Sequence, residues 1–169
     1  LKDRVSESLG LLYAMHWPFR QYESARGVRE SPLHERIGAA GGVFGETAGW
    51  ERPNWFANEG QAREYEYSYG KQNWQDNMVA ECMGVREAVG VFDQTSFAKF
   101  VVKGPDALEV LNTISVANID APVGKAIYTQ WCNRKGGIES DLTVTRTDED
   151  AFFVVTAAAA ENRDLSWLK

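Results

Sequence analysis

The sequence predicts an α+β fold in which an antiparallel sheet is flanked by helices. Two observations predict it. Three strand-like segments follow one another through residues 126–156 with only tight turns between them, which is typical of antiparallel strands. Apolar residues recur at three- and four-residue spacing in segments before and after them, which indicates helices. The expected order is helix, strand, helix, three antiparallel strands and helix.

The first segment, residues 1–29, is aromatic and basic. Pro18 lies between two aromatic residues, and proline is poorly tolerated inside a helix. We therefore predict an extended connector that packs against a partner. The sequence begins at Leu1 without Met and stops at Lys169 inside a predicted helix, so we expect it to be a piece of a longer protein.

A helix and a strand are expected next. Ser31 suits the N-cap and Pro32 suits the first helical position, which predicts a helix that ends at residues 41–42, two glycines. One strand is expected within residues 43–56. Residues 58–73 are polar with alternating tyrosines, and they predict either an edge strand or a surface excursion.

The clearest helix spans residues 75–90. Cys82 lies on its apolar face and is expected to be a small buried hydrophobic residue. The glycines of residues 133–137 suit the positive φ angles of a hairpin loop. Two further helices are expected, one starting at residues 104–106 and one over residues 159–169. The predicted strands cover residues 97–103, 126–132, 138–146 and 151–156.

The composition is that of a globular protein and excludes several classes of partner. The 169 residues include 18 Lys and Arg against 24 Asp and Glu, a net charge of −6, which argues against a nucleic-acid surface. No apolar run approaches the roughly 20 residues that cross a bilayer, so no membrane partner is expected. Two cysteines, Cys82 and Cys132, are too few for a disulfide framework and indicate a reducing, intracellular setting.

The sequence lacks the residue patterns of a nucleotide-binding site, a metal site and a nucleophilic triad. The glycine-rich segment 38–49 fits neither a dinucleotide-binding nor a Walker pattern, so we expect its glycines to have structural roles. His16 and His34 lack the acidic or cysteine neighbours of a metal site, and His34 is expected at the surface or in packing. Ser96 and Ser140 have no partnered His, which leaves a nucleophilic triad without support.

Four polar residues remain as binding candidates: Asn118, Asp120, Tyr128 and Asp141. Asn118 and Asp120 lie on a loop between a predicted helix and a predicted strand, where binding groups are often placed. On the residues alone, solvated loop polars and an edge tyrosine are the alternative interpretation.

Several motifs in order resemble the glycine-cleavage T-protein (aminomethyltransferase) family. They lie at residues 31–36, 48–53, 85–93, 102–108, 124–129 and 133–145. The resemblance covers residues 31–169, and it implies the amino-terminal half of a T-protein-like, tetrahydrofolate-binding domain.

Residues 9–18, with Arg26 and Gly27, resemble the end of the central domain in FAD-dependent dimethylglycine and sarcosine dehydrogenases. This resemblance implies that residues 1–30 are the tail of that domain. The parent protein would then oxidise an N-methyl amine with FAD, whose binding domain lies outside this chain. Its folate domain would capture the released one-carbon unit as methylenetetrahydrofolate.

The same resemblance implies partners and a location. The partners are a folate, a methylamine substrate and the FAD domain of the same polypeptide. The parent enzyme would be cytoplasmic in a bacterium or in the mitochondrial matrix of a eukaryote. The chain by itself is expected to be inactive.

The resemblance also implies site residues. T-proteins place an Asp in the loop before the strand at residues 126–132, whereas this chain has Asn118 there and Asp120 two residues on. An amide can only hydrogen-bond, so either Asp120 is the catalytic carboxylate through a shifted loop, or this branch of the family does not use one. Asn118, Tyr128 and Phe97 are the folate-binding candidates. Phe97 would be either an aromatic wall for the folate ring or a core residue.

Two other functions stay open. Asn118 in place of the acid favours a non-catalytic T-protein-like scaffold or regulatory domain. A stand-alone folate-dependent aminomethyltransferase or demethylase would have the same fold, but the aromatic connector at residues 9–17 argues against it.

Overall fold

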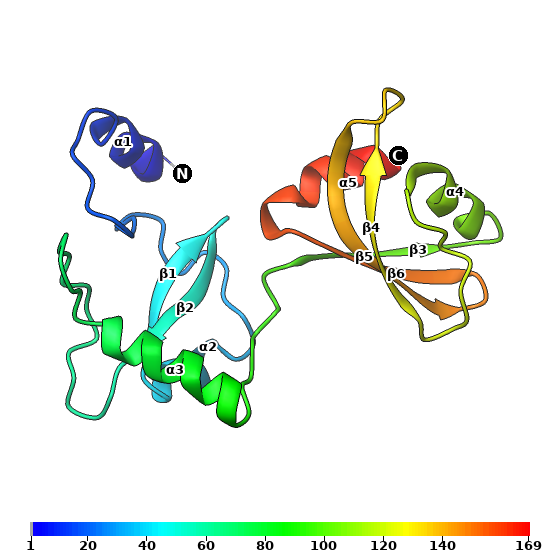
Figure 1. Ribbon diagram of the computed structural model, residues 1–169. Helices are drawn as coiled ribbons and strands as arrows, with labels where there is room; N and C mark the ends of the chain where they lie inside the picture. Colours follow the sequence, from blue (N-terminus) through cyan, green and yellow to red (C-terminus); the bar gives the residue numbers. More distant parts are fainter. Residues whose placement is uncertain (1) are drawn as a thin grey trace. The chain divides into compact units, whose positions relative to one another are not determined.

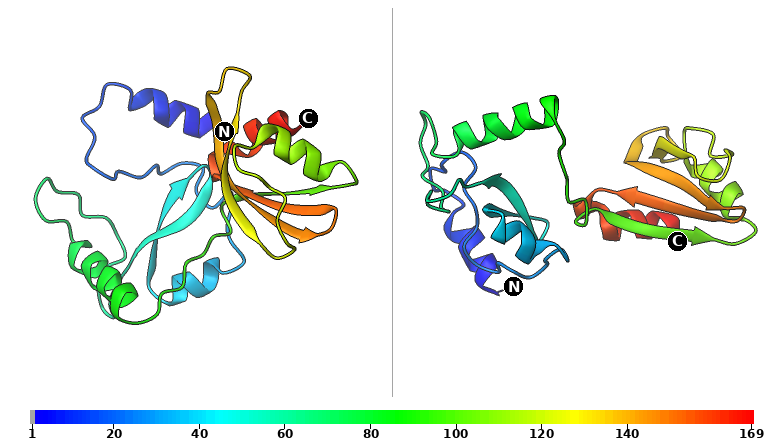
Figure 2. Two further views of the ribbon diagram at one scale, coloured as in Figure 1. Left: turned by 45° about the vertical axis from the view of Figure 1, so that its right-hand side comes forward. Right: turned by 90° about the horizontal axis from the view of Figure 1, so that it is seen from below.

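The computed structural model describes residues 2–169, which form two compact units, Leu1–Ser96 and Phe97–Lys169 (Figures 1 and 2). The first unit contains α1 (Lys2–Gly10), α2 (His34–Ala39), β1 (Gly42–Thr47), β2 (Trp50–Phe56) and α3 (Gln75–Glu87). The second contains β3 (Ala98–Lys103), α4 (Ala107–Ile114), β4 (Ala126–Cys132), β5 (Ile138–Asp148), β6 (Ala151–Thr156), a 3₁₀ turn (Ala158–Ala160) and α5 (Glu161–Leu168). Within residues 2–169 no helix is long and apolar enough to span a membrane.

The second unit is a four-stranded antiparallel sheet in the order β3-β6-β5-β4. Each of the four strands forms where its pattern predicts, within two residues at either end. The α+β prediction is confirmed, although the strands of the chain divide between this sheet and a separate two-stranded one. Gly136 has φ +79°, as expected for the hairpin loop between β4 and β5.

One face of this sheet carries the core of the second unit. Strand side chains alternate between faces, so every second residue of β4, β5 and β6 points toward α4. Leu111 of α4 and Trp131 of β4 are both fully buried. The remaining buried members of the core are Ala107, Ile119, Leu142, Val144, Phe152 and Val154. The opposite face is open, with Val101 69% exposed and Tyr128 63% exposed.

A buried polar cluster fixes α5 to the same side of the sheet. The carboxylate of Asp164 accepts hydrogen bonds from Thr156 Oγ1 at 2.5 Å and Ser140 Oγ at 2.7 Å. Burial opposes the charge of Asp164, but the hydrogen bonds from Thr156, Arg163 and Ser140 outweigh burial and hold the pKa of Asp164 below its ordinary value. Ser140 is thus a structural hydroxyl that anchors a helix.

The first unit is built on the β1–β2 hairpin, where sequence reasoning expected one strand. The expectation was wrong because the turn, Ala48-Gly49, is not a common hairpin pair. Both residues have positive φ, +52° and +82°, the geometry of a tight two-residue turn. Gly41 has the structural role expected of the glycine-rich segment, since its φ is +99° and a Cβ would lie 2.5 Å from the Ala57 carbonyl oxygen.

Aromatic residues fill the small core of the first unit. Trp55 and Trp74 are buried and stack with ring centroids 6.5 Å apart. Tyr65 and Tyr67 pack against them. These two tyrosines come from residues 58–73, which contain no strand, so the surface excursion is the correct alternative and the edge strand is wrong.

Three further predictions need correction in the first unit. Residues 2–10 form helix α1, not an extended segment, because the first proline comes only at position 18. Helix α2 begins at His34, later than Pro32, although Ser31 Oγ does accept the Leu33 N–H at 3.1 Å. Cys82 is exposed because nothing in this unit covers the apolar side of α3.

We predict that Leu111→Ala lowers the free energy of unfolding of the second unit by about 2–5 kcal/mol. The truncation leaves a cavity between α4 and the sheet, where Leu111 is fully buried among the core residues. Urea denaturation followed by circular dichroism measures the loss. Val101→Ala, on the open face, is the control and should change the stability by less than about 0.5 kcal/mol.

Candidate functional site

The sequence-predicted site residues all lie in the second unit. Tyr128 of β4 and Asp141 of β5 are joined directly, because the Tyr128 hydroxyl donates to Asp141 Oδ2 at 2.9 Å. Both side chains are exposed on the open face of the sheet. The pair presents a carboxylate and a phenol oxygen to solvent, an arrangement that can accept hydrogen bonds from N–H groups of a bound ring.

Asp120 is paired with a cation. Arg146 Nη1 donates to Asp120 Oδ1 at 3.1 Å, and its guanidinium also lies over the ring of Phe152, 5.5 Å from the centroid. Asn118 acts on the same loop, since its Oδ1 accepts the backbone N–H of Asp120 at 3.0 Å. Asn118 therefore shapes the loop that presents the Asp120 carboxylate.

The structure brings these residues together as two pairs and not as one cluster. Arg146 is in register with the buried Phe152, so the Asp120–Arg146 pair belongs to the end of the covered face. Tyr128 and Asp141 alternate with buried neighbours and lie on the open face. Phe97 directly precedes β3 and is half-buried. The binding roles of all these residues stay predictions.

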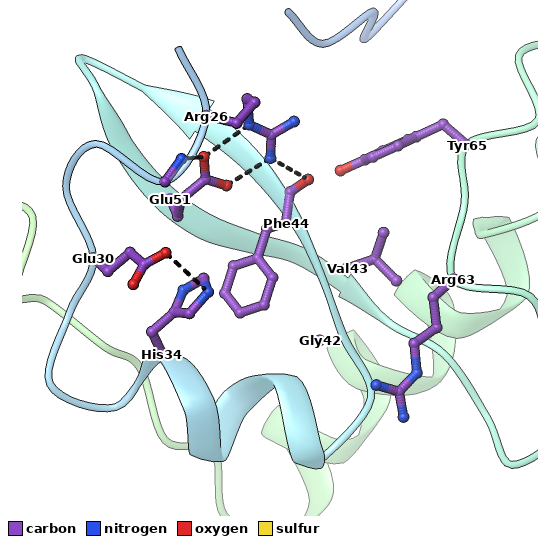
Figure 3. A pocket seen from close by; sticks show the side chains of 10 residues that line it. Arg26, Glu30, His34, Gly42, Val43, Phe44, Glu51, Arg63 and Tyr65 are labelled. Carbon is purple, nitrogen blue, oxygen red and sulfur yellow. Dashed lines mark hydrogen bonds and ion pairs between the residues drawn. The ribbon is translucent and has the colours of Figure 1, made fainter. Parts of the chain in front are cut away.

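A pocket of about 430 Å³ lies in the first unit, and sequence reasoning missed it (Figure 3). Its lining combines charged and aromatic side chains from the connector, α2, β1, β2 and the loop before α3. The lining residues are Arg26, Gly27, Glu30, His34, Gly42, Val43, Phe44, Glu51, Arg63 and Tyr65.

The centre of this pocket wall is an ion pair between the partly exposed Arg26 and the buried Glu51. Arg26 Nη2 and Nε donate to the two carboxylate oxygens of Glu51 at 2.6 and 2.7 Å, and the backbone N–H of Gly27 adds a third bond at 2.8 Å (Figure 3). The guanidinium of Arg26 lowers the pKa of Glu51, and this effect exceeds the opposing effect of burial. Glu51 is only 7% exposed. Two charged residues 25 positions apart leave no periodic pattern, so no sequence signal marks the pair.

His34 lies beside that ion pair in a packing role, as expected. Its ring stacks on Phe44 with centroids 4.1 Å apart, and its Nε2 is 3.5 Å from Glu30 Oε1. Across the pocket, burial raises the pKa of the Tyr65 phenol. Within residues 2–169, no group of three or more His, Cys, Asp or Glu side chains could hold a metal ion.

Two known protein families match consecutive parts of the chain. The GCVT N-terminal domain matches residues 33–169, and the FAD dependent oxidoreductase central domain matches residues 1–31. A crystal structure of the glycine cleavage system aminomethyltransferase T from Bartonella henselae is similar with a TM-score of 0.67 and 26% identity. The similarity covers 84% of this chain and 35% of that one.

Curated relatives extend the similarity across the whole chain. The 4-methylaminobutanoate oxidase (formaldehyde-forming) of Paenarthrobacter nicotinovorans is 47% identical over all 169 residues. The mouse mitochondrial pyruvate dehydrogenase phosphatase regulatory subunit is 32% identical over 99% of the chain, and human mitochondrial sarcosine dehydrogenase is 34% identical over 86%. The chain spans about a fifth of the length of these relatives, 20%, 20% and 18% respectively. The expected resemblance is confirmed.

We predict that the stability of the first unit falls as the pH drops below about 4.5. Because the folded-state pKa of Glu51 is lowered from 4.5, its stabilisation is complete above the unfolded pKa and is lost as pH falls through the lower folded value. Thermal unfolding between pH 7 and pH 3 measures this dependence. Glu51→Gln should be less stable at pH 7 and should flatten the acid limb; an unchanged acid limb would contradict the assignment.

Proposed function

This chain belongs to the GCVT N-terminal domain family, and on that premise we propose that it is the tetrahydrofolate-binding part of an FAD-dependent N-methyl amine dehydrogenase. The observation that carries the proposal is the order of two families in one chain. The match to the oxidoreductase central domain ends at residue 31, and the match to the GCVT N-terminal domain begins at residue 33. A dehydrogenase and a one-carbon acceptor joined in one polypeptide fit oxidation of an N-methyl group followed by capture of its carbon. The mitochondrial names of the mammalian relatives support the matrix as the location of a eukaryotic parent.

The open face of the second unit suits a folate ring by its donor and acceptor set. A pterin ring presents amino and ring N–H donors, and the Tyr128–Asp141 pair offers a hydroxyl and a carboxylate as acceptors. We assign Tyr128 and Asn118 to folate binding, with Phe97 as an aromatic wall. Bound tetrahydrofolate supplies the nucleophilic nitrogens that accept the one-carbon unit.

Asp120 is the proposed catalytic carboxylate. Its partner Arg146 holds the side chain at the loop end through the ion pair described above. An ionised carboxylate stabilises positive charge that develops on a nearby nitrogen and accepts a proton from it. The backbone N–H of Asp120, bonded to Asn118 Oδ1, keeps the loop in that position.

The names of two relatives favour alternatives in which folate does not always capture the one-carbon unit. The oxidase from P. nicotinovorans is named formaldehyde-forming, which supports a version of the parent that releases the carbon to solvent. The mouse relative is named a regulatory subunit, and together with Asn118 in the acidic position it supports a non-catalytic, regulatory second candidate.

We predict that the full-length parent binds tetrahydrofolate with micromolar affinity under anaerobic conditions. Asp120→Asn and Tyr128→Phe should each weaken binding by about tenfold or more, because each removes one charged or polar contact worth about 1.4 kcal/mol. Isothermal calorimetry measures both. Glu109→Gln, an exposed carboxylate on α4, is the matched control and should bind like the parent.

Product analysis separates the alternatives. With folate present, the amine oxidation should yield methylenetetrahydrofolate in place of free formaldehyde, and Asp120→Asn should shift the yield toward formaldehyde. No folate binding in the intact protein would refute the folate role. A large gain in folate-coupled turnover from Asn118→Asp would show that the present site is decayed and would favour the regulatory candidate.

A further inference from the structure

The segment that matches the oxidoreductase central domain is folded into the first unit through buried ionic contacts. Besides the bonds to Glu51, Arg26 Nη2 donates to the Phe44 carbonyl oxygen at 3.2 Å. The backbone of Arg29 forms a parallel bridge with Trp50, and its carbonyl accepts the Glu51 N–H at 2.9 Å. The edge of the hairpin therefore continues into the connector as one hydrogen-bonded element.

A second set of contacts fixes the beginning of the segment. Arg4 of α1 donates to Glu46 Oε2 of β1 at 2.6 Å and to the Ser24 carbonyl at 2.5 Å, and its guanidinium lies 4.2 Å from the ring centroid of Tyr22. Glu7 of α1 accepts the backbone N–H of Ser24 at 2.9 Å. These bonds hold the two ends of a loop of about 20 residues together, which reduces the number of conformations open to the segment between α1 and the hairpin.

The other side of the segment is apolar and exposed. Five large side chains, which we call the apolar strip, lie within residues 9–19, from the end of α1 onward. Their exposed fractions are 66% for Leu9, 65% for Leu12, 94% for Tyr13, 89% for Met15 and 67% for Phe19. Five exposed large apolar side chains within eleven residues are typical of a segment that another structure covers.

We propose that residues 2–31 form a rigid two-sided joint whose ionic side is fixed to the β1–β2 hairpin and whose apolar strip docks on the flavin domain of the same polypeptide. The occupant follows from the sequence of the strip itself, because residues 1–31 match the FAD dependent oxidoreductase central domain. The inference rests on the proposed function only in taking a flavin domain to be present.

A rigid joint fixes the orientation of the flavin domain relative to the β1–β2 hairpin, because the ionic contacts leave the connector fewer conformations than a flexible linker has. The Arg26–Glu51 pair is therefore a positioning contact and touches no reacting atom.

The ionic side is tested by limited trypsin digestion of the full-length parent, with cleavage after Arg20, Arg26 and Arg29 followed by mass spectrometry. Glu51→Gln should accelerate cleavage at these sites at least tenfold, because the freed connector leaves its bridge to Trp50. Asp76→Asn, which breaks the exposed Lys71–Asp76 pair of the same unit, should leave the rates unchanged.

Arg4→Met is a second variant, of similar side-chain length, that removes the Arg4–Glu46 pair and the contact of the guanidinium with the Tyr22 ring. It should accelerate cleavage after Arg20 and so tests the joint if Glu51→Gln does not fold. Cleavage rates in Glu51→Gln and Arg4→Met that match those of Asp76→Asn would overturn the ionic side of the proposal.

The apolar side is tested by peroxide oxidation of Met15 in the native full-length parent and in the same protein unfolded in guanidinium. Docking should slow oxidation of Met15 at least tenfold in the native protein, and equal rates would overturn it. None of these measurements needs folate or amine. Loss of folate binding with a protected Met15 would refute the proposed function and leave the joint in place.

Discussion

The first unit depends on the requirement that a buried carboxylate be fully matched. Glu51 is buried on β2, where an uncompensated charge would destabilise the unit by about 3–5 kcal/mol. Arg26 and the Gly27 N–H supply the match, and both come from the connector. The hairpin is therefore less stable when the connector is not in place. This ion pair, with the Arg4–Glu46 pair and the bridge between Arg29 and Trp50, joins two segments with different family matches into a single unit.

The second unit satisfies its polar groups within its own strands and helices. Asp164 is matched by Thr156, Ser140 and Arg163, and the apolar core is closed by α4. Arg146 likewise has a local role: its guanidinium lies over the ring of Phe152 and holds the end of the Asp120 loop through an ion pair. A unit of this kind can present loop residues at fixed positions, which is the property a binding site needs.

Periodicity predicted most of the second unit and less of the first, for a physical reason. Strands such as β4 and β6 alternate because one face is buried and the other open, so pattern and bounds coincide. The β1–β2 turn depends on a positive φ at Ala48, and alanine is not a residue whose presence predicts positive φ. The Arg26–Glu51 pair depends on residues distant in sequence, and the split of Asp120 and Tyr128 between two faces depends on strand register. Neither the ion pair nor the placement on two faces can be predicted from the pattern of residues within one segment.

Helix α3 shows the limit most clearly and explains what the first unit still requires. Its apolar spacing predicted the helix correctly, but its apolar side is exposed, with Val79 52% and Met83 46% accessible. A hollow of about 720 Å³ borders that side, lined in part by Ile37, Phe56 and Val85. Hydrophobic periodicity identifies which face of a helix will be covered but not by what. The exposed strip and the exposed face of α3 therefore share one cause: the aromatic core of the first unit is small, and much of the unit's apolar surface is left for other structures to bury.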